Sequence, residues 1–368
     1  MRDVSALWWF VVLGVVVVLL AGGLVGTALT LRRRDRASEH VITAEPEDRP
    51  LAAVVVNPVK IDELSREDIA AVCAQLGWAP PLWLPTTPED PGTGQAREAV
   101  ANGADVVIAC GGDGTVRAVA QSLAGTRVAM GLVPTGTGNL LARTLRIPLD
   151  VASATRVALT GDDRAIDVGR LCSDPEDPAD DLSDDPADPG DRADERVFLV
   201  MAGTGLDATI MQSTPEELKG RVGPLAYIIS GLRAVRGRRA RVSIAIDGAP
   251  PLRRSTRMVV VGNTGNLGGG LALMPDAAVD DGRLDVVSLA PKGLLGWVAV
   301  LGRVVTRNQR GSRRIEHWQA HEVVITSDVA QPAQLDGDLI GETRELRIRV
   351  DAGALVVRVP GRVERGAS

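Results

Sequence analysis

The sequence has few of the residues that several common folds and sites require. Its 368 residues include three cysteines, Cys73, Cys110 and Cys172, which are odd in number and far apart. They predict neither a disulfide framework nor a zinc site, and this usage is typical of a reducing compartment. One tyrosine and two phenylalanines are too few for the aromatic platforms on which single-stranded nucleic acid stacks. The formal net charge of −6 also argues against a general nucleic-acid-binding protein.

A loop of the pattern Gly-x-x-x-x-Gly-Lys-Ser/Thr is also absent from the sequence, which disfavours a P-loop nucleotide-binding protein. The rest of the composition is that of a globular protein, with 45% hydrophobic and 24% charged residues. The length allows one large or two ordinary domains, each with a real hydrophobic core.

Residues 6–31 contain no charged side chain. As a helix this stretch would be about 39 Å long, more than the ~30 Å hydrocarbon core of a bilayer. Trp8 and Trp9 lie near one end of the stretch, and three arginines, 32–34, follow the other end. Both kinds of residue are typical anchors at a membrane interface, and arginines favour the cytoplasmic side. We therefore predict a single-pass transmembrane helix in the cell membrane, with the folded domains that follow in the cytoplasm and residues 32–50 as a linker. A cleaved signal peptide is the alternative, but its apolar region is usually shorter.

The most informative stretch is residues 110–116, Cys-Gly-Gly-Asp-Gly-Thr-Val. It follows an apolar run at 104–109 and precedes a helical pattern at 116–123, which predicts a buried strand, a glycine turn and the start of a helix. Glycines let backbone N–H groups close on an anion, and the helix N-terminus favours negative charge. The stretch therefore predicts a phosphate site, with Asp113 next to a Mg²⁺ ion. A plain strand-to-helix turn is the alternative.

Residues 51–163 alternate strand and helix patterns, which predicts a mostly parallel sheet covered on both faces. Ligands of such sheets bind beyond the carboxyl ends of the strands. Asn57, Thr86 and Thr87 follow two of the predicted strands. A second glycine loop, Pro-Thr-Gly-Thr-Gly-Asn at 134–139, follows another strand. In this loop the hydroxyl group of Thr137 could bind a phosphate. The two loops together predict a cleft.

Residues 164–345 change to alternating patterns of period two, which predict an antiparallel domain of two packed sheets. Within them, residues 173–195 contain eleven Asp or Glu residues and several prolines. Such a segment cannot bury a core, so we predict a disordered acidic insertion.

The pentad Gly-Gly-Asp-Gly-Thr at 111–115, followed by Pro-x-Gly-Thr-x-Asn at 134–139, resembles the diacylglycerol kinase and sphingosine kinase family of lipid kinases, most closely its bacterial type. NAD kinases share the pentad, whereas the second loop is more specific to lipid kinases. The resemblance covers roughly residues 51–360. It implies an α/β nucleotide-binding domain, then a lipid-binding β-sandwich, with C-terminal strands at 346–362 returning to the first domain. The fold class is thus α/β + β, of the NAD kinase and diacylglycerol kinase type.

The resemblance also implies roles for particular residues. Asp338, in Leu-Asp-Gly-Asp at 335–338, takes the place of the family's Asp-Gly-Glu glutamate, which accepts the proton of the lipid hydroxyl. Its side chain is one methylene shorter, and a β-turn without a catalytic role is the alternative. Asp113 would be the second catalytic residue, through Mg²⁺. Asp281 and the carbonyl groups of Ala278 and Arg283 would hold a structural Mg²⁺. The implied ATP-binding residues are Asn57, Thr86, Thr87, Gly111, Gly112, Asp113, Gly114, Thr115, Val116, Arg117 and Thr137.

The family often has Asn-Pro-x-Ser-Gly where this chain has Asn57-Pro58-Val59-Lys60. The chain thus departs from the family at this loop. Taken as a whole, the resemblance implies an ATP-dependent lipid kinase that uses Mg²⁺ and most readily converts diacylglycerol to phosphatidic acid. Its expected partners are ATP, a membrane lipid, the bilayer and a second copy in a homodimer, but not nucleic acid. An NAD-kinase-like phosphotransferase and a membrane-tethered nucleotide-binding protein without turnover are the alternatives.

Overall fold

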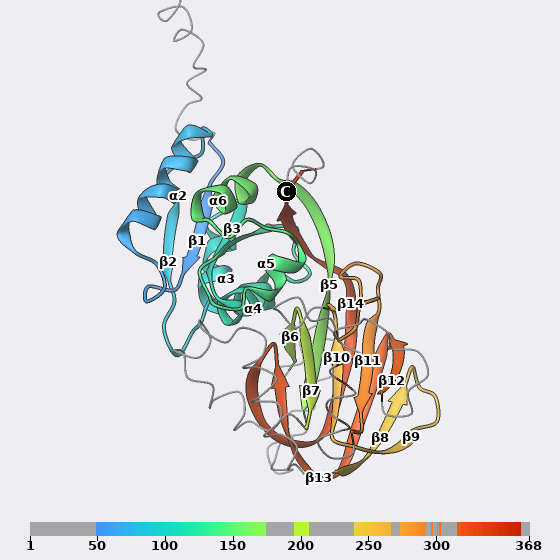
Figure 1. Ribbon diagram of the computed structural model, residues 1–368. Helices are drawn as coiled ribbons and strands as arrows, with labels where there is room; N and C mark the ends of the chain where they lie inside the picture. The colour runs from blue at the N-terminus through green and yellow to red at the C-terminus, as the bar shows by residue number, and fades with distance from the viewer. Residues whose placement is uncertain are drawn as a thin grey trace, which may run out of the picture. The chain divides into compact units, whose positions relative to one another are not determined.

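The computed structural model describes residues 49–173, 195–205, 239–265, 273–291, 296, 300, 302 and 315–361 (Figure 1). The chain divides into two compact units, residues 1–49 and 50–368. All the helices and strands below belong to the second unit.

The first part of this unit, which we call the α/β half, contains four parallel strands in the order β2-β1-β3-β4. Every residue of β1, β3 and β4 is buried, as expected for strands covered on both faces. The helices pack in pairs, α2 against α6 and α3 against α4. The elements are β1 (Ala52–Val56), α2 (Glu63–Gln75), β2 (Leu82–Pro85), α3 (Thr93–Ala101), β3 (Val106–Gly111), α4 (Asp113–Leu123), β4 (Ala129–Pro134), α5 (Leu140–Thr144) and α6 (Val151–Thr160).

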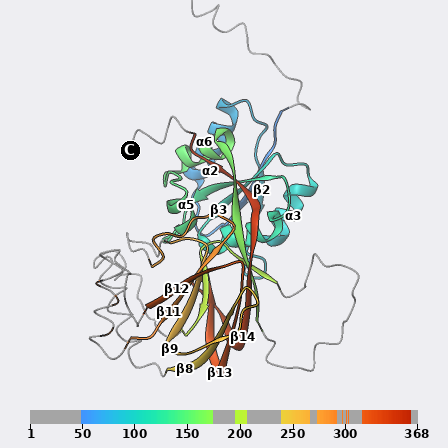
Figure 2. The same ribbon diagram turned by 90° about the vertical axis from the view of Figure 1, so that its right-hand side faces the viewer.

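The second part, which we call the β half, consists of strands whose mutual pairings are all antiparallel among the described residues (Figure 2). A separate cluster of buried apolar side chains, including Phe198 and Ile244, forms its core. The strands are β5 (Asp162–Ser173), β6 (Arg196–Phe198), β7 (Met201–Thr204), β8 (Ala240–Ile246), β9 (Leu252–Thr256), β10 (Met258–Gly262), β11 (Leu284–Leu289), β12 (Ile315–Ala320), β13 (Glu322–Leu335) and β14 (Asp338–Val359).

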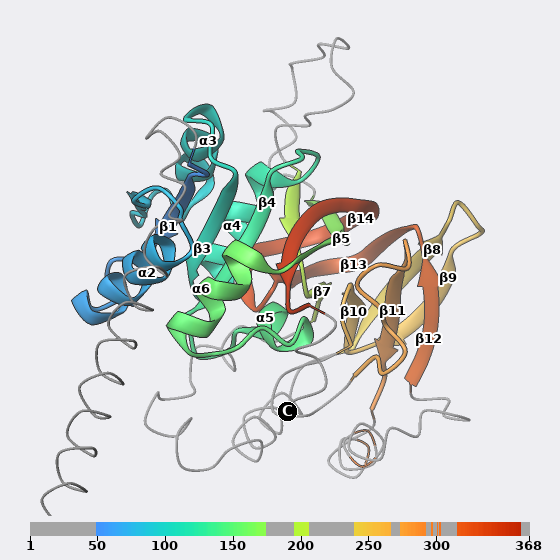
Figure 3. The ribbon, with the colours of Figure 1, turned by 90° about the horizontal axis from the view of Figure 1, so that it is seen from above.

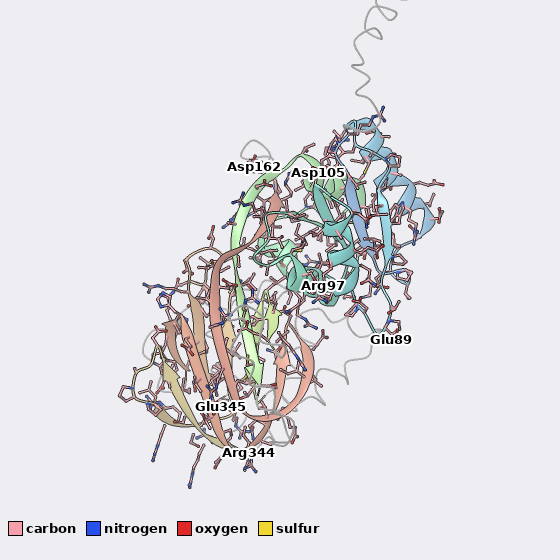
Figure 4. The ribbon with its side chains drawn as sticks, turned by 180° about the vertical axis from the view of Figure 1, so that it is seen from behind. Glu89, Arg97, Asp105, Asp162, Arg344 and Glu345 are labelled. Carbon is pink, nitrogen blue, oxygen red and sulfur yellow. The ribbon has the colours of Figure 1, made fainter. Side chains whose placement is uncertain are left out.

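The long strand β14 joins the two halves. Its first part pairs with β13, where Glu345 lies opposite Thr326 (Figure 4). Residues 346–351 and 355–359 of the strand pair with β5. Near its end, Val357 pairs in parallel with Met130 of β4, so that β14 continues the sheet of the α/β half (Figure 3). The turn between β13 and β14 is therefore fixed with respect to the strands of both halves.

The expected α/β half followed by a β half is observed, but the expected membrane anchor is contradicted. None of the helices in the described ranges combines the length and the apolar character needed to cross a bilayer, and residues 6–31 lie outside those ranges. A charge-free run meets the length requirement of a bilayer span without being sufficient evidence for one. The predictions of a transmembrane helix at 6–31 and of a single-pass location in the cell membrane are therefore wrong.

Other predictions fall on residues that the structure leaves out. The linker at 32–50 and the acidic insertion at 173–195 lie outside the described residues, except for their last or first positions. At the end of the insertion, the Glu195 side chain is 7% exposed and pairs with Arg349 at 2.8 Å and with Arg170 at 3.5 Å. The chain is thus attached to β5 and β14 where the insertion ends.

Candidate active site

The first glycine loop lies where β3 ends and α4 begins, with Gly112 as the residue that precedes the helix. A Cβ atom on Gly111 would lie 2.6 Å from the Cβ and Oγ1 atoms of Thr115, so a larger residue does not fit there. Thr115 and Val116 are themselves buried, and the Val116 N–H donates to the Gly112 carbonyl within the helix. The loop therefore offers an anion its glycine backbone and the first turn of α4 rather than these two side chains.

The second glycine loop packs directly on the first. The Thr135 N–H donates to the Gly111 carbonyl at 3.0 Å. A Cβ atom on Gly136 would lie 2.5 Å from the Cα atom of Gly112, so the two backbones touch. The structure therefore brings the two predicted loops together, and Thr137 is exposed on the second of them.

Asp113 joins the two loops. Its Oδ1 atom accepts a 2.7 Å hydrogen bond from the Leu140 N–H, the first residue of α5. A Cβ atom on Gly138 would lie 2.5 Å from Oδ2, so this oxygen faces the second loop. Asn139 directly precedes this helix, but its side chain bonds both backbone groups of Gly136 and does not cap the helix. Asp113 thus has a structural role in addition to any role toward a metal.

Asp338 comes from the start of β14 and lies beside the first glycine loop. Arg117 of α4 donates from Nη2 to Asp338 Oδ2 at 2.7 Å and from Nη1 to the Leu335 carbonyl at 2.6 Å. A Cβ atom on Gly114 would lie 3.7 Å from Asp338 Oδ2. The Asp338 side chain is 60% exposed, so a substrate can reach it. Two residues that are 221 positions apart are thereby placed at one loop.

Asp336 holds this turn in place, and sequence reasoning assigned it no role. Its carboxylate accepts hydrogen bonds from the N–H groups of Leu199, Val200 and Met201 at 2.8–3.0 Å. Burial raises the pKa of this carboxyl, while the three N–H donors act in the opposite direction. Its φ of 49° is the left-handed conformation that aspartate tolerates in turns. The first acid of the Asp-Gly-Asp sequence was the signal for this anchor.

Asn57, Thr86 and Thr87 lie at the carboxyl ends of β1 and β2, as expected. Asn57 donates its N–H to the Cys110 carbonyl at 3.1 Å, and the Thr86 N–H donates to the Val56 carbonyl at 2.9 Å. The Thr87 hydroxyl accepts from the Asp90 N–H at 3.1 Å, which closes a local turn. Asn57 is therefore attached directly to the strand that carries the first glycine loop.

Ala278, Asp281 and Arg283 lie in the segment before β11. Asp281 Oδ1 accepts from the Arg283 N–H at 3.0 Å. Burial raises the pKa of Asp281, and the nearby carboxylates of Asp285 and Asp167 raise it further. A hard cation would relieve this repulsion, so the oxygen donors suit Mg²⁺. However, within the described ranges no group of three or more His, Cys, Asp or Glu side chains forms a metal site, and the structural Mg²⁺ stays a prediction.

Asp167, which sequence reasoning did not single out, organises this segment. It is 2% exposed, and its carboxylate accepts from the Gly282 N–H at 2.6 Å and the Gly353 N–H at 2.8 Å. These bonds connect β5, the segment before β11, and β14. Asp285 is also buried; its Oδ1 lies 2.7 Å from His317 Nε2 but in a geometry that leaves this oxygen without a hydrogen bond.

Comparison with known proteins identifies relatives over most of the second unit. The family model of the diacylglycerol kinase catalytic domain matches residues 52–171, and that of the YegS C-terminal NAD kinase beta sandwich-like domain matches residues 200–359. A probable YegS-like lipid kinase of Pseudomonas aeruginosa is 33% identical over 306 residues, 79% of this chain and 89% of that protein. A diacylglycerol kinase of Staphylococcus saprophyticus is 27% identical over 80% of this chain and 90% of that protein.

A solved structure shows the same fold. The crystal structure of a diacylglycerol kinase from Bacillus anthracis superposes with a TM-score of 0.60, covering 84% of this chain and 96% of that one, at 21% identity. At this level of identity the likeness concerns the arrangement of the elements, not the reaction.

Proposed function

Since the chain belongs to the family of diacylglycerol kinases and YegS-like lipid kinases, we propose that it transfers the γ-phosphoryl group of ATP to the hydroxyl group of a lipid. Diacylglycerol is the proposed acceptor and phosphatidic acid the product. A kinase of this family uses ATP and typically a divalent metal. The choice of diacylglycerol is supported by the names of relatives such as the Staphylococcus saprophyticus enzyme.

The observation that carries this proposal is the position of Asp338 beside Gly114. The loop supplies backbone donors and a helix N-terminus, which suit the phosphates of a nucleotide. A carboxylate at the same loop suits the removal of a proton from an alcohol. Phosphoryl transfer needs mainly such positioning and charge stabilisation, so the two features together support a kinase.

The proposed step uses one oxygen of Asp338. Arg117 occupies Oδ2, and this charge-assisted bond fixes the carboxylate, so that Oδ1 can accept the proton of the lipid hydroxyl. The lipid oxygen forms a bond to the γ-phosphorus atom, and the bond from phosphorus to the bridging oxygen breaks, releasing ADP. The Arg117 contact also offers a reason why the shorter aspartate can take the family's glutamate position.

Asp113 is the proposed residue for holding the catalytic Mg²⁺, which would neutralise phosphate charge when bound with ATP. One oxygen of Asp113 is used by Leu140, and the other is available on the side of the second loop. The nucleotide's remaining proposed contacts are Gly111, Gly112, Gly114, Thr115, Val116, Arg117, Thr137, Asn57, Thr86 and Thr87. A homodimer and contact with a bilayer remain predictions.

The test is an assay of the purified protein with labelled ATP, Mg²⁺ and mixed micelles that contain diacylglycerol. We expect labelled phosphatidic acid from the wild type. Asp338→Asn should lower kcat by roughly 10²–10⁴-fold, the range for loss of a general base, whereas Asp338→Glu should keep activity. Asp68→Asn, the same change at an exposed position of α2, is the matched control. Full activity of Asp338→Asn would contradict the proposed base, and phosphorylation of NAD in place of every lipid offered would contradict the acceptor.

A further inference from the structure

The connection between β1 and α2 departs from the family pattern and is folded tightly. Asn57 Oδ1 accepts from the Val59 N–H at 3.1 Å, and the Asn57 carbonyl accepts from the Lys60 N–H at 3.0 Å. Because Asn57 is also bonded to Cys110 of β3, this turn is attached next to the first glycine loop. The turn therefore directs Lys60 rather than the usual Ser-Gly pair toward the loop.

The Lys60 ammonium group lies against Gly112. A Cβ atom built on Gly112 would be 3.0 Å from Lys60 Nζ. Lys60 is exposed, and in the part of the chain that the structure describes no carboxylate within 4.0 Å pairs with it. The two acids assigned to this site have other partners: Asp113 accepts from the Leu140 N–H, and Asp338 pairs with Arg117.

This arrangement places like charges together. Gly112 precedes α4, a helix of 11 residues, whose N-terminus carries a partial positive charge. An ammonium group at the same place is unfavourable unless an anion lies between them. A lysine is a point charge with three donors that suits phosphate oxygens. The geometry therefore points to a phosphate group next to Lys60.

The position of Asp338 indicates which phosphate this is. Asp338 marks the Gly114 end of the loop as the place of transfer, and Lys60 marks the Gly112 end. Because Gly112 and Gly114 are two residues apart, the two ends of the loop lie within about 7 Å of each other, so both can face the same nucleotide. We propose that Lys60 binds a phosphate of ATP that is not transferred, the α- or β-phosphate, and therefore also holds ADP. This inference depends on the proposed function for the identity of the nucleotide as ATP and for Asp338 as the mark of the place of transfer.

The first test is affinity labelling with an acyl phosphate of ATP and with one of ADP. The Lys60 amine attacks the acyl carbon, an amide bond forms, the bond from acyl carbon to phosphate oxygen breaks, and the nucleotide leaves while the amine loses a proton to solvent. The chain has three lysines, Lys60, Lys219 and Lys292, so peptide mapping identifies the labelled one directly. We expect labelling at Lys60 that excess ATP or ADP prevents. An unlabelled Lys60 in protein that binds ATP would overturn the proposal.

The second test measures nucleotide dissociation constants by calorimetry in the absence of lipid. Lys60→Gln should raise the Kd for both ATP and ADP roughly tenfold to hundredfold, the loss expected for a bond to a charged group, and leave adenosine unchanged. Lys60→Arg should recover part of the affinity. Arg97→Gln, which removes the same charge from an exposed position on α3 (Figure 4), should bind ATP as the wild type does.

The outcomes separate this inference from the proposed function. If the wild type phosphorylates no lipid but Lys60→Gln loses ATP affinity, the role of Lys60 stands and the acceptor is wrong. If Lys60→Gln binds ATP and ADP as the wild type does, the inference is overturned even when the protein is an active lipid kinase. Loss of binding to vesicles containing phosphatidic acid, with nucleotide binding intact, would instead assign Lys60 to a lipid headgroup and also overturn it.

Discussion

The α/β half and the β half contribute to the candidate site in different ways. In the α/β half the loops follow directly from buried parallel strands, and their glycines let two backbones touch. In the β half the contribution is a single turn between two long strands, β13 and β14. The first contribution is local in sequence, whereas the second depends on the path of β14 back to the α/β half.

The two halves nevertheless divide the work in a similar way. In each half, one residue fixes the geometry of a turn or loop. A neighbouring residue, about two positions away in sequence, is left to contact a ligand. Asp336 is bonded to three backbone N–H groups while Asp338 is exposed. Gly136 and Gly112 make the contact between loops, while Gly114 has open space above it apart from Asp338. Substitutions at these neighbouring positions should therefore separate stability from activity.

The largest effect on stability is expected at Asp336. Asp336→Ala leaves the N–H groups of Leu199, Val200 and Met201 without their acceptor, which should lower the free energy of unfolding by about 2–4 kcal/mol. Urea unfolding followed by circular dichroism measures this. Asp338→Ala, two positions away, loses an exposed ion pair and should change stability by less than about 1 kcal/mol while abolishing most activity. Equal destabilisation by both variants would contradict the division within the β half.

A smaller effect is expected for a matched pair in the α/β half. Gly136→Ala places a Cβ atom 2.5 Å from the Gly112 backbone, so the loops must separate, and we expect a loss of about 1–3 kcal/mol. In Gly114→Ala the nearest atom would be 3.7 Å away, an ordinary contact, and alanine favours the helix. This variant should keep or slightly gain stability and lose activity through its position under the proposed phosphate. Thermal unfolding together with the lipid kinase assay distinguishes the two.

Much of the α/β half could be predicted from sequence because its information is local. Continuous apolar runs indicated the buried strands, and glycines at their ends indicated the loops, including the region around Gly111 and Thr137. The capping of α5 could not be predicted, because the acceptor is Asp113 from the other loop and not the neighbouring Asn139. A cap supplied from 27 positions away leaves no pattern in the sequence near the helix.

The β half was predicted in outline but not in extent. The alternating pattern indicated an antiparallel domain at 164–345, but not that β13 and β14 are single strands of 14 and 22 residues. The acid at position 336 is visible in the sequence, but its three N–H donors and the Arg117–Asp338 contact come from distant segments, so no local pattern predicts these partners. The charge-free run at 6–31 is the opposite case. Here the local pattern was clear, but it led to a membrane prediction that the structure contradicts.

The smallest effect concerns two cysteines, one in each half. Cys110, at the end of β3, is buried, and burial raises its pKa to about 12. Cys172, on β5, is only partly buried. Because the thiolate is the reactive form, iodoacetamide at pH 8 should modify Cys172 of the folded protein well before Cys110, and mass spectrometry of the two peptides measures the order.

The same pKa predicts the sign of a pH effect on stability. From about pH 9 to about pH 12 the folded protein keeps the Cys110 proton that the unfolded chain loses, so the free energy of unfolding falls as pH rises through this range. Below it the contribution is fully present. Cys110→Ala should therefore show a shallower decline between pH 8.5 and 10 than the wild type, since one titrating thiol contributes at most about 1.4 kcal/mol per pH unit. An equal decline in both proteins, or fast alkylation of Cys110, would mean that water reaches the end of β3, and the difference in burial between Cys110 and Cys172 would not hold in solution.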